Sequence, residues 1–408
     1  MTTSPAAPAR SQEDVRRHNL ASLLQLLHVN GATSRAALTA STGLNRSTVK
    51  ALVAELANLG LVRESAPAGT GMAGRPSILV EPESAQVFAV AVDIGVEHLT
   101  VARIGLAGTV IDRRHLDQRR GDHDVELTVR RAAKLITQQL DRAPLDAVCV
   151  GVGVAVPGLV AADGGVVRFA PNLGWKDLPF KRLLAERVGR SLPIAVGNEA
   201  DLGAMAEHIR GAAARYTDAV YLSGEVGLGG GIIVGGRLLV GAGGYAGEIG
   251  HMIVNPRGQR CRCGARGCWE TEVGEEAILR ATKSRPGTTL DEVREAFEHG
   301  DPAAHKGIRQ IGKWLGVGIA NLANILNPQI VILGGTTREI YAAALPFVRE
   351  TLQSVLAAPR DHLRLQLAAL GSDSALLGAA EKAFAALLQS PDEVAGELAG
   401  GTAAIAAT

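Results

Sequence analysis

Three of the four cysteines of the chain lie close together, a short distance after a histidine. The spacing is His251-x9-Cys261-x-Cys263-x4-Cys268. Thiolate and imidazole are the ligands that Zn²⁺ prefers, and four protein ligands complete a tetrahedral structural site with no open position. Gly264 and Gly267 let the chain turn so that the sulfurs converge. The pattern predicts a structural zinc site; the alternative is three buried or redox-active cysteines without a metal.

Two acidic residues flank these ligands. Glu248 precedes His251 by three positions, and Glu270 follows the last cysteine by two. Residues 247–252 (GEIGHM) and 261–270 (CRCGARGCWE) resemble two motifs of the ROK family, which contains sugar kinases and sugar-responsive repressors. In that family the corresponding side chains hold sugar hydroxyls, so the resemblance implies sugar binding by Glu248, His251 and Glu270. The chemistry is suitable, because carboxylates accept hydroxyl hydrogen bonds and a metal-bound imidazole keeps its orientation.

The composition is that of an ordinary globular protein. The 408 residues suffice for two or three domains, with 47% hydrophobic and 20% charged residues. No long apolar run predicts a membrane span, and the N-terminus lacks the apolar core of a signal peptide. Cysteines grouped as metal ligands suit a reducing compartment. We therefore expect a cytoplasmic protein without a membrane partner.

The N-terminal part of the chain has the pattern of a winged helix-turn-helix. Leucines at helical spacing predict a first helix over residues 14–28, and a short second helix follows. Gly43 makes a tight turn before a third helix over residues 46–59. Two short strands, at 61–63 and 77–80, enclose a glycine-rich loop that has the outline of a wing.

This module carries the residues that we expect to contact DNA. Polar and basic side chains at the start of the third helix can reach phosphates or base edges in a major groove, and an arginine in the wing suits a minor groove. The predicted contacts are Asn45, Arg46, Ser47, Thr48, Lys50 and Arg75. The module also resembles the winged helix of ROK repressors, which ROK kinases lack. Double-stranded operator DNA is the implied partner; the alternative is a small protein-interaction module.

Three segments differ from the ROK kinase pattern where kinases handle phosphate or remove a proton. Asp93-Ile94-Gly95-Val96-Glu97-His98 stands where the kinases have a sequence resembling Asp-Ile-Gly-Gly-Thr-Lys. Glu199 replaces the catalytic aspartate, and Glu225 lies in a second phosphate turn. Carboxylates repel phosphate, and Val96 crowds the approach to the backbone. We expect no enzyme activity, with Glu199 as the vestigial catalytic position.

The resemblance implies three further sugar contacts, Asn172, Asn198 and Glu199. An amide both donates and accepts hydrogen bonds, as a sugar hydroxyl requires. Asn198-Glu199-Ala200 resembles the version in xylose-type repressors of the family. Structural alternatives remain open: Asn172 could form an Asx turn beside Pro171, and Asn198 could cap the following helix, a role that is compatible with sugar binding.

The resemblance implies a two-lobed, actin-like (ribonuclease H-like) α/β sugar-kinase fold behind the α+β winged helix-turn-helix. The predicted units are the DNA-binding module (1–82), a first lobe (83–200) rejoined by a C-terminal helix (374–388), a second lobe with the zinc site (201–373), and a disordered tail (389–408). The tail is expected to be disordered because it is rich in alanine and glycine.

Together these features predict a sugar-responsive transcriptional repressor. A monosaccharide in the interlobe cleft would change the affinity for operator DNA, and the family implies a homodimer or homotetramer that reads a palindromic site. Two alternatives remain: an ATP-dependent, hexokinase-type sugar kinase with an appended DNA-binding domain, and a zinc-dependent scaffold that binds no sugar.

Overall fold

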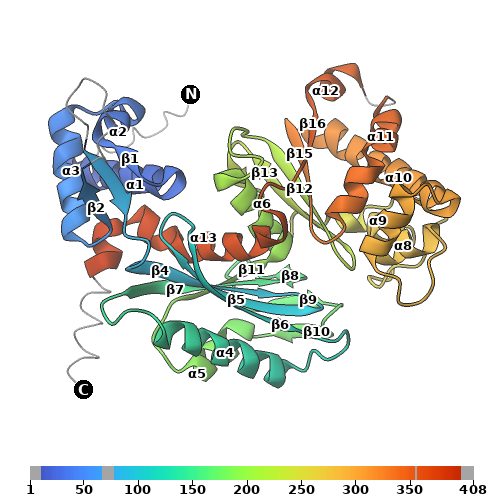
Figure 1. Ribbon diagram of the computed structural model, residues 1–408, viewed down its shortest axis with the longest axis horizontal. Helices are drawn as coiled ribbons and strands as arrows, with labels where there is room; N and C mark the ends of the chain where they lie inside the picture. The colour runs from blue at the N-terminus through green and yellow to red at the C-terminus, as the bar shows by residue number, and fades with distance from the viewer. Residues whose placement is uncertain (1–10, 67–77, 354–355, 397–408) are drawn as a thin grey trace, which may run out of the picture.

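The computed structural model describes residues 11–66, 78–353 and 356–396 (Figure 1). An N-terminal module packs beside two α/β lobes, each built on a five-stranded sheet. The two-lobed arrangement predicted from the sequence is therefore present. Among the described helices, none combines the length and the apolar character needed to cross a lipid bilayer.

The N-terminal module is a helix-turn-helix followed by a small antiparallel sheet. Its elements are α1 (Gln12–Asn30), β1 (Thr33–Ser34), α2 (Arg35–Thr42), α3 (Arg46–Asn58), β2 (Val62–Ser65) and β3 (Leu79–Pro82), with sheet order β1-β3-β2. Ser11 and Ser34 cap the first two helices, and Gly43, with φ +69°, makes the turn into α3. The predicted helices and strands are present. The loop with Arg75 lies outside the described residues.

The first lobe is organised around a mixed sheet with strand order β11-β7-β4-β5-β6. The strands are β4 (Val87–Ile94), β5 (His98–Gly105), β6 (Val110–Asp117), β7 (Val148–Val156) and β11 (Ile194–Asn198). Helices α4 (Val125–Asp141) and α5 (Phe180–Val188) cover one face, and α13 (Ser374–Gln389) covers the other (Figure 1). Every residue of β4 is buried, as a continuous apolar run between two helical layers requires.

A second, three-stranded sheet extends this lobe toward the cleft. It consists of β8 (Leu159–Val160), β9 (Val167–Ala170) and β10 (Trp175–Leu178), which pair antiparallel in the order β10-β9-β8. Trp175 is buried against Phe180 and donates its indole N–H to the carbonyl oxygen of His123. The turn between β9 and β10 presents Asn172.

The second lobe has a sheet with strand order β14-β13-β12-β15-β16. The strands are β12 (Ala219–Gly224), β13 (Leu228–Val234), β14 (Arg237–Leu238), β15 (Ile330–Gly334) and β16 (Arg364–Leu367). One face is covered by a helical layer that includes α10 (Pro302–Leu326) and α11 (Arg338–Leu352). The remaining helices are α7 (Trp269–Val273), α8 (Glu275–Ala281), α9 (Leu290–Glu298) and α12 (Ala357–His362).

Helix α6 (Glu199–Arg210) covers the other face of the second sheet and also packs against α13 of the first lobe. The two helices touch through their backbones: a β-carbon added to Gly378 of α13 would lie 1.9 Å from the carbonyl oxygen of Leu202. The contact between α6 and α13 is therefore a place where the two lobes meet without intervening side chains.

The expectation of disorder from residue 389 onward is wrong for the first part of the tail. Residues 391–396 are helical, and their acidic side chains pair with α1: Arg16 Nη2 lies 3.3 Å from Asp392, and Arg17 Nη1 lies 2.9 Å from Glu393. The composition of the tail could not reveal this helix, because the arginines that pair with it come from the opposite end of the chain. Residues 397–408 lie outside the described residues.

Replacing Gly378 by alanine should lower the midpoint temperature of thermal unfolding. Alanine normally stabilises a helix relative to glycine. Here, however, the added methyl group would meet backbone that has no room to move. Overpacking of this kind costs about 1–3 kcal/mol of folding free energy. In a large domain each kcal/mol lowers the midpoint temperature by roughly 2–4 °C. Calorimetry on the purified variant measures the shift. Ala386→Leu, at an exposed position of the same helix, is the control; equal midpoints for Gly378→Ala and wild type would contradict the close contact.

Candidate ligand and metal site

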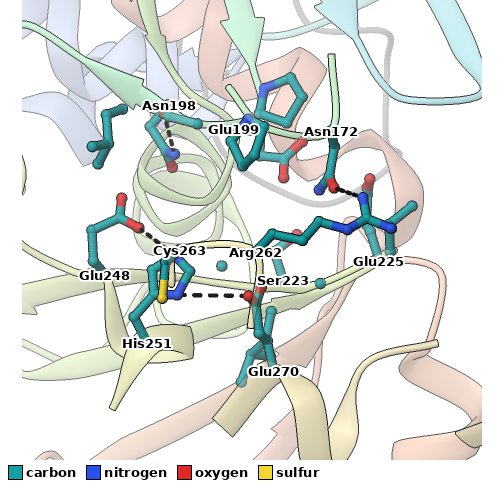
Figure 2. A pocket seen from close by; sticks show the side chains of 18 of the residues that line it. Asn172, Asn198, Glu199, Ser223, Glu225, Glu248, His251, Arg262, Cys263 and Glu270 are labelled. Carbon is teal, nitrogen blue, oxygen red and sulfur yellow. Dashed lines mark hydrogen bonds and ion pairs between the residues drawn. The ribbon is translucent and has the colours of Figure 1, made fainter. Parts of the chain in front are cut away.

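A cavity of about 340 Å³ lies between the two lobes, within the size range of small-molecule sites. The six residues predicted to bind sugar all line this one cavity: Asn172, Asn198, Glu199, Glu248, His251 and Glu270 (Figure 2). The first three come from the first lobe and the start of α6, and the other three come from the loop and knuckle of the second lobe. The cavity is therefore lined by hydrogen-bonding groups from both lobes.

The four predicted metal ligands converge beside this cavity, and two of them, His251 and Cys263, line it. The ligand atoms of His251, Cys261, Cys263 and Cys268 all lie within 4.8 Å of one another. The sulfurs of Cys263 and Cys268 are 3.6 Å apart, and the Cys261 sulfur is 3.7 Å from His251 Nδ1. A tetrahedron with Zn–S bonds of about 2.3 Å has edges of about 3.8 Å. The donor set and its spacing therefore fit a single tetrahedral metal ion.

Backbone geometry explains how so short a segment brings the sulfurs together. Gly264 and Gly267 have φ values of +97° and +76°, a region that L side chains avoid. A β-carbon on Gly267 would lie 1.7 Å from the carbonyl oxygen of Asn255. The two glycines are thus required by the turn of the knuckle, as the sequence predicted.

The two ring nitrogens of His251 face different groups. Nδ1 faces Cys261 and lies 3.6 Å from Glu270 Oε1, whereas Nε2 lies 3.9 Å from Glu248 Oε2 (Figure 2). Nδ1 is therefore the nitrogen placed to bind a metal. Nε2 remains on the side of Glu248, where it can donate a hydrogen bond to a ligand.

The side chain of Asn198 caps α6. Its Oδ1 accepts from the backbone N–H groups of Ala200 and Asp201, at 2.8 and 3.1 Å, and its Nδ2 donates to the carbonyl oxygen of Gly158 at 2.9 Å. The capping role considered from the sequence is therefore present. Both lone pairs of the oxygen are occupied, so only one N–H of Asn198 remains for a ligand.

Arg262 was not among the predicted site residues, yet it reaches across the cleft. Its Nη1 donates to Asn172 Oδ1 at 2.7 Å, and its Nη2 donates to Glu276 Oε1 at 2.9 Å (Figure 2). The backbone of Arg262 is held between two metal ligands, Cys261 and Cys263. That position between the cysteines was the only sign of its role in the sequence.

Burial and nearby carboxylates raise the pKa values of three carboxyl groups of the cavity. Burial, followed by the charges of Glu225, Asp93 and Glu248, raises the pKa of Glu199 well above its ordinary value. Burial and the charge of Asp93 also raise the pKa of Glu225 to about 7. Burial again raises the pKa of Glu248, although His251 opposes the shift. Near neutral pH the cavity therefore holds protonated carboxyl groups, which can both donate to and accept from hydroxyls.

The segment that would cradle a phosphate in a kinase is filled by a side chain. A β-carbon on Gly95 would lie 2.1 Å from Cε1 of His98, so the imidazole lies directly against this glycine. His98 Nε2 is 3.1 Å from Asp93 Oδ2. Burial alone would lower the pKa of His98, but this hydrogen bond and the charges of Asp93, Glu225 and Glu97 raise it to about 9.

Like Arg262, Arg120 bridges the two lobes, and it lies on the side of the cleft where His98 is located. Arg120 of the first lobe donates from Nε to Glu97 Oε1 at 2.8 Å and from Nη2 to Glu275 of the second lobe. The side chains of His98 and Arg120 are both paired with carboxylates and line a neighbouring pocket with Glu225. Neither cation is therefore free to receive a phosphate without losing an existing partner.

The predicted DNA contacts at the start of α3 lie on the surface. Asn45 caps the helix by accepting from the backbone N–H of Thr48 at 2.8 Å and from Ser47 Oγ at 2.6 Å. Arg46 and Lys50 are exposed, and neither forms an ion pair with a carboxylate of residues 11–66, 78–353 or 356–396. The exposed cations are therefore available to a phosphate.

The pH dependence of stability provides a test of a partly buried carboxyl group of α6, Asp201, which lies near Glu248 of the cavity. Burial and the charge of Glu248 raise the pKa of Asp201 from 3.8 to about 7. Because this pKa is raised, the folded protein holds the proton more tightly than the unfolded chain does. The stabilisation is complete below about pH 4 and is lost as the pH rises through about 7.

Asp201→Asn cannot ionise, so it should lose less thermal stability than wild type between about pH 5 and about pH 8. Differential scanning fluorimetry at the two pH values measures the difference, which we expect to reach at least about 2 °C. Asp117→Asn, at a side chain that is 97% exposed, is the matched control. Parallel pH profiles for wild type and Asp201→Asn would show that Asp201 is ionised throughout.

Comparison with known proteins relates this site to a family. The sequence profile of the ROK family matches residues 89–385. The xylose repressor of Bacillus subtilis (strain 168) is 32% identical over 372 residues, which cover 90% of this chain and 95% of the repressor.

Solved structures show the same relation. A ROK family transcriptional regulator, a homologue of the Escherichia coli MLC protein, has a TM-score of 0.76 and 25% identity and covers 94% of this chain and 99% of its own. A ROK glucokinase from Streptomyces griseus, solved with glucose and AMPPNP, has a TM-score of 0.62 and 29% identity over 72% of this chain and 98% of its own. Its two-lobed fold corresponds to the sugar-kinase architecture predicted here, and the chain belongs to the ROK family.

Proposed function

We propose that this protein is a sugar-responsive transcriptional repressor. The observation that carries the proposal is the presence, in one chain, of a cavity between two lobes lined by hydrogen-bonding groups and of a helix-turn-helix with exposed cations at the start of α3. The Bacillus subtilis xylose repressor and a ROK transcriptional regulator match 90% or more of the chain, including most of its length outside the family profile. The match to the glucokinase covers 72% of the chain.

In this proposal a monosaccharide binds in the cavity between the lobes. Its hydroxyls form hydrogen bonds with the carboxyl groups of Glu248, Glu270 and Glu199. An ionised carboxylate accepts such a bond, and a protonated carboxyl group can also donate one. His251 donates from Nε2, and Asn198 supplies its remaining N–H. Asn172 is held by Arg262, so a sugar either keeps this pair and adds to it or displaces the arginine.

The metal in this proposal is Zn²⁺ with a structural role. Cys261, Cys263 and Cys268 would bind it through sulfur and His251 through Nδ1, which leaves no open coordination position for catalysis. The bound ion would fix the knuckle, neutralise thiolate charge and hold the imidazole in place. Thiolate ligands of this kind are maintained in a reducing compartment, which is consistent with a cytoplasmic repressor.

Kinase activity is the second candidate, because the family also contains glucokinases such as the structural relative described above. The packing of His98 against Gly95 and the carboxylates Glu97 and Glu225 argue against phosphate binding there. Glu199 has a longer side chain than the aspartate expected in a kinase, and a misplacement of about 1 Å can reduce a rate about a hundredfold. We therefore propose that the chain binds sugar without phosphorylating it.

The DNA-binding role leads to the first test. Nuclease footprinting of the protein on DNA upstream of its own gene, with and without xylose, glucose or N-acetylglucosamine, should reveal a protected palindrome. We propose that a homodimer or homotetramer binds it, with one α3 in each half-site. At least one sugar should change the affinity by about fivefold or more. A coupled assay with ATP, Mg²⁺ and the same sugars should show no turnover; turnover near 1 s⁻¹ or above would instead support a kinase.

Arg46→Ala should weaken binding to the protected DNA by about fivefold to a hundredfold, because the substitution removes a cation at the start of α3. Fluorescence anisotropy measures the loss, and calorimetry should show unchanged sugar affinity. Arg182→Ala, at an exposed arginine on α5, should leave both affinities as they are. Normal DNA affinity in Arg46→Ala would place the DNA contact elsewhere than the start of α3.

Cys263→Ser should lose most of the bound zinc and at least about tenfold of the sugar affinity, because the loss of one ligand releases the knuckle and the orientation of His251. Atomic absorption gives the metal content and calorimetry gives the affinity. Cys149→Ser, at the cysteine outside the knuckle, should retain both. Full sugar affinity in a metal-free Cys263→Ser protein would separate the sugar cavity from the metal.

A further inference from the structure

A buried polar cluster joins the N-terminal module to both lobes. It consists of His28 of α1, Arg210 at the end of α6 and Glu381 of α13; His28 is 1% exposed and Glu381 is 4% exposed. Glu381 Oε2 lies 2.8 Å from His28 Nε2, and Arg210 Nε donates to Glu381 Oε1 at 2.9 Å. Polar and charged groups are costly to bury, so an ion pair and a histidine at one junction indicate a role beyond filling space.

The hydrogen bonds define the state of His28 and connect a fourth element. The backbone N–H of Ala107, in the turn between β5 and β6, donates to Nδ1 at 3.0 Å, so Nε2 carries the hydrogen that His28 donates to Glu381. Arg210 Nη1 donates to the carbonyl oxygen of Ala107 at 2.9 Å. Ala107 has φ +74°, an uncommon conformation for a residue other than glycine. The backbone N–H and carbonyl oxygen of Ala107 are thus both hydrogen-bonded to the cluster.

Arg210 lies at the opposite end of the helix that begins in the sugar cavity. Asn198 caps the first turn of α6, and Glu199 lines the cavity. The helix has 12 residues, so its ends are about 18 Å apart. Helix α6 packs on β12 and β13 of the second lobe and, on its other side, on α13 of the first lobe, so it lies at the boundary between the lobes.

The partners of Arg210 belong to the other side of the junction. Glu381 is on α13, which packs on β4 and β7 of the first lobe, and Ala107 lies in the turn that joins β5 and β6 of the same sheet. Between the two helices lies the bare backbone contact at Gly378. Lobe movements in proteins commonly proceed by small sliding of packed helices. A tilt of about 5° would move the far end of an 18 Å helix by about 1.5 Å, which is enough to break a hydrogen bond.

We propose that Arg210 is the positioning residue through which movement of the second lobe reaches the DNA-binding module. When α6 shifts, the bonds from Arg210 to Glu381 and Ala107 change, and these two groups hold His28 of α1. The inference rests on the proposed sugar-responsive function, and it specifies how the response is transmitted.

Arg210→Lys provides the test, because lysine keeps the positive charge beside Glu381 but lacks the planar fork that serves two acceptors. The variant should bind xylose or glucose, whichever binds the wild type, with an affinity within about threefold of wild type, since Arg210 is far from the cavity. The sugar-dependent change in DNA affinity, measured by anisotropy on the protected fragment, should fall from about fivefold or more to less than about twofold. Glu381→Gln should have the same effect.

Arg113→Lys is the matched control. Arg113 also bridges two elements, donating to Asp373 Oδ2 at 2.6 Å, but within the described residues none of its hydrogen bonds or ion pairs reaches α1 or α6. It should keep the full sugar response. A cluster that only fastens the module would lower DNA affinity equally with and without sugar; an unchanged ratio in Arg210→Lys would therefore overturn the inference and leave the proposed function intact.

Hydrogen exchange in the sugar-free protein keeps the inference testable if the wild type binds no sugar, a result that would refute the proposed function itself. Arg210→Lys should increase amide exchange in residues 20–30 of α1 by about tenfold, without changing exchange in the knuckle. Arg113→Lys should leave both segments as in wild type. Equal exchange of α1 in wild type and Arg210→Lys would overturn the inference regardless of the sugar result.

Discussion

The convergence of three sulfurs and one imidazole within 4.8 Å is the constraint on which the cavity depends. The knuckle between His251 and Cys268 is a turn rather than a packed layer, so its shape depends on what its ligand atoms bind. His251, Glu270 and Arg262 all take their positions from this turn, and each faces the cleft. A metal ion at the ligands would therefore set three of the groups that a bound molecule meets, although it lies outside the cavity itself.

Electrostatics decide which molecules this cleft favours. Burial and neighbouring carboxylates raise the pKa values of Glu199, Glu225 and Glu248, so additional negative charge would be unfavourable. The cations on the kinase-like side, His98 and Arg120, are already paired. A neutral polyhydroxyl ligand adds no charge and uses both protonation states of the carboxyl groups. The same arrangement makes a nucleotide a poor ligand unless it first breaks these ion pairs.

The sequence predicted the elements that have strong local patterns. A fully buried strand such as β4 is a continuous apolar run in the sequence, and the knuckle follows from the spacing of its ligands. The strands β8 to β10 were missed because each is short and is stabilised by pairing with the others rather than by its own residues. Arg262 and Arg210 were missed for another reason: their partners, Asn172 and Glu381, are distant in sequence, and no local pattern encodes such contacts.

Helix α6 connects these observations. Its cap, Asn198, has committed its side-chain oxygen to the helix and one N–H to Gly158, so a ligand that takes the remaining N–H acts directly on the end of α6. A ligand can shift the position of this helix only to the extent that it binds one lobe arrangement better than the other. The cavity meets that condition because its polar groups come from both lobes, and a sugar can satisfy all of them only at one separation. In the proposed transmission, α6 would carry this preferred separation to Arg210, which contacts His28 of α1 in the N-terminal module.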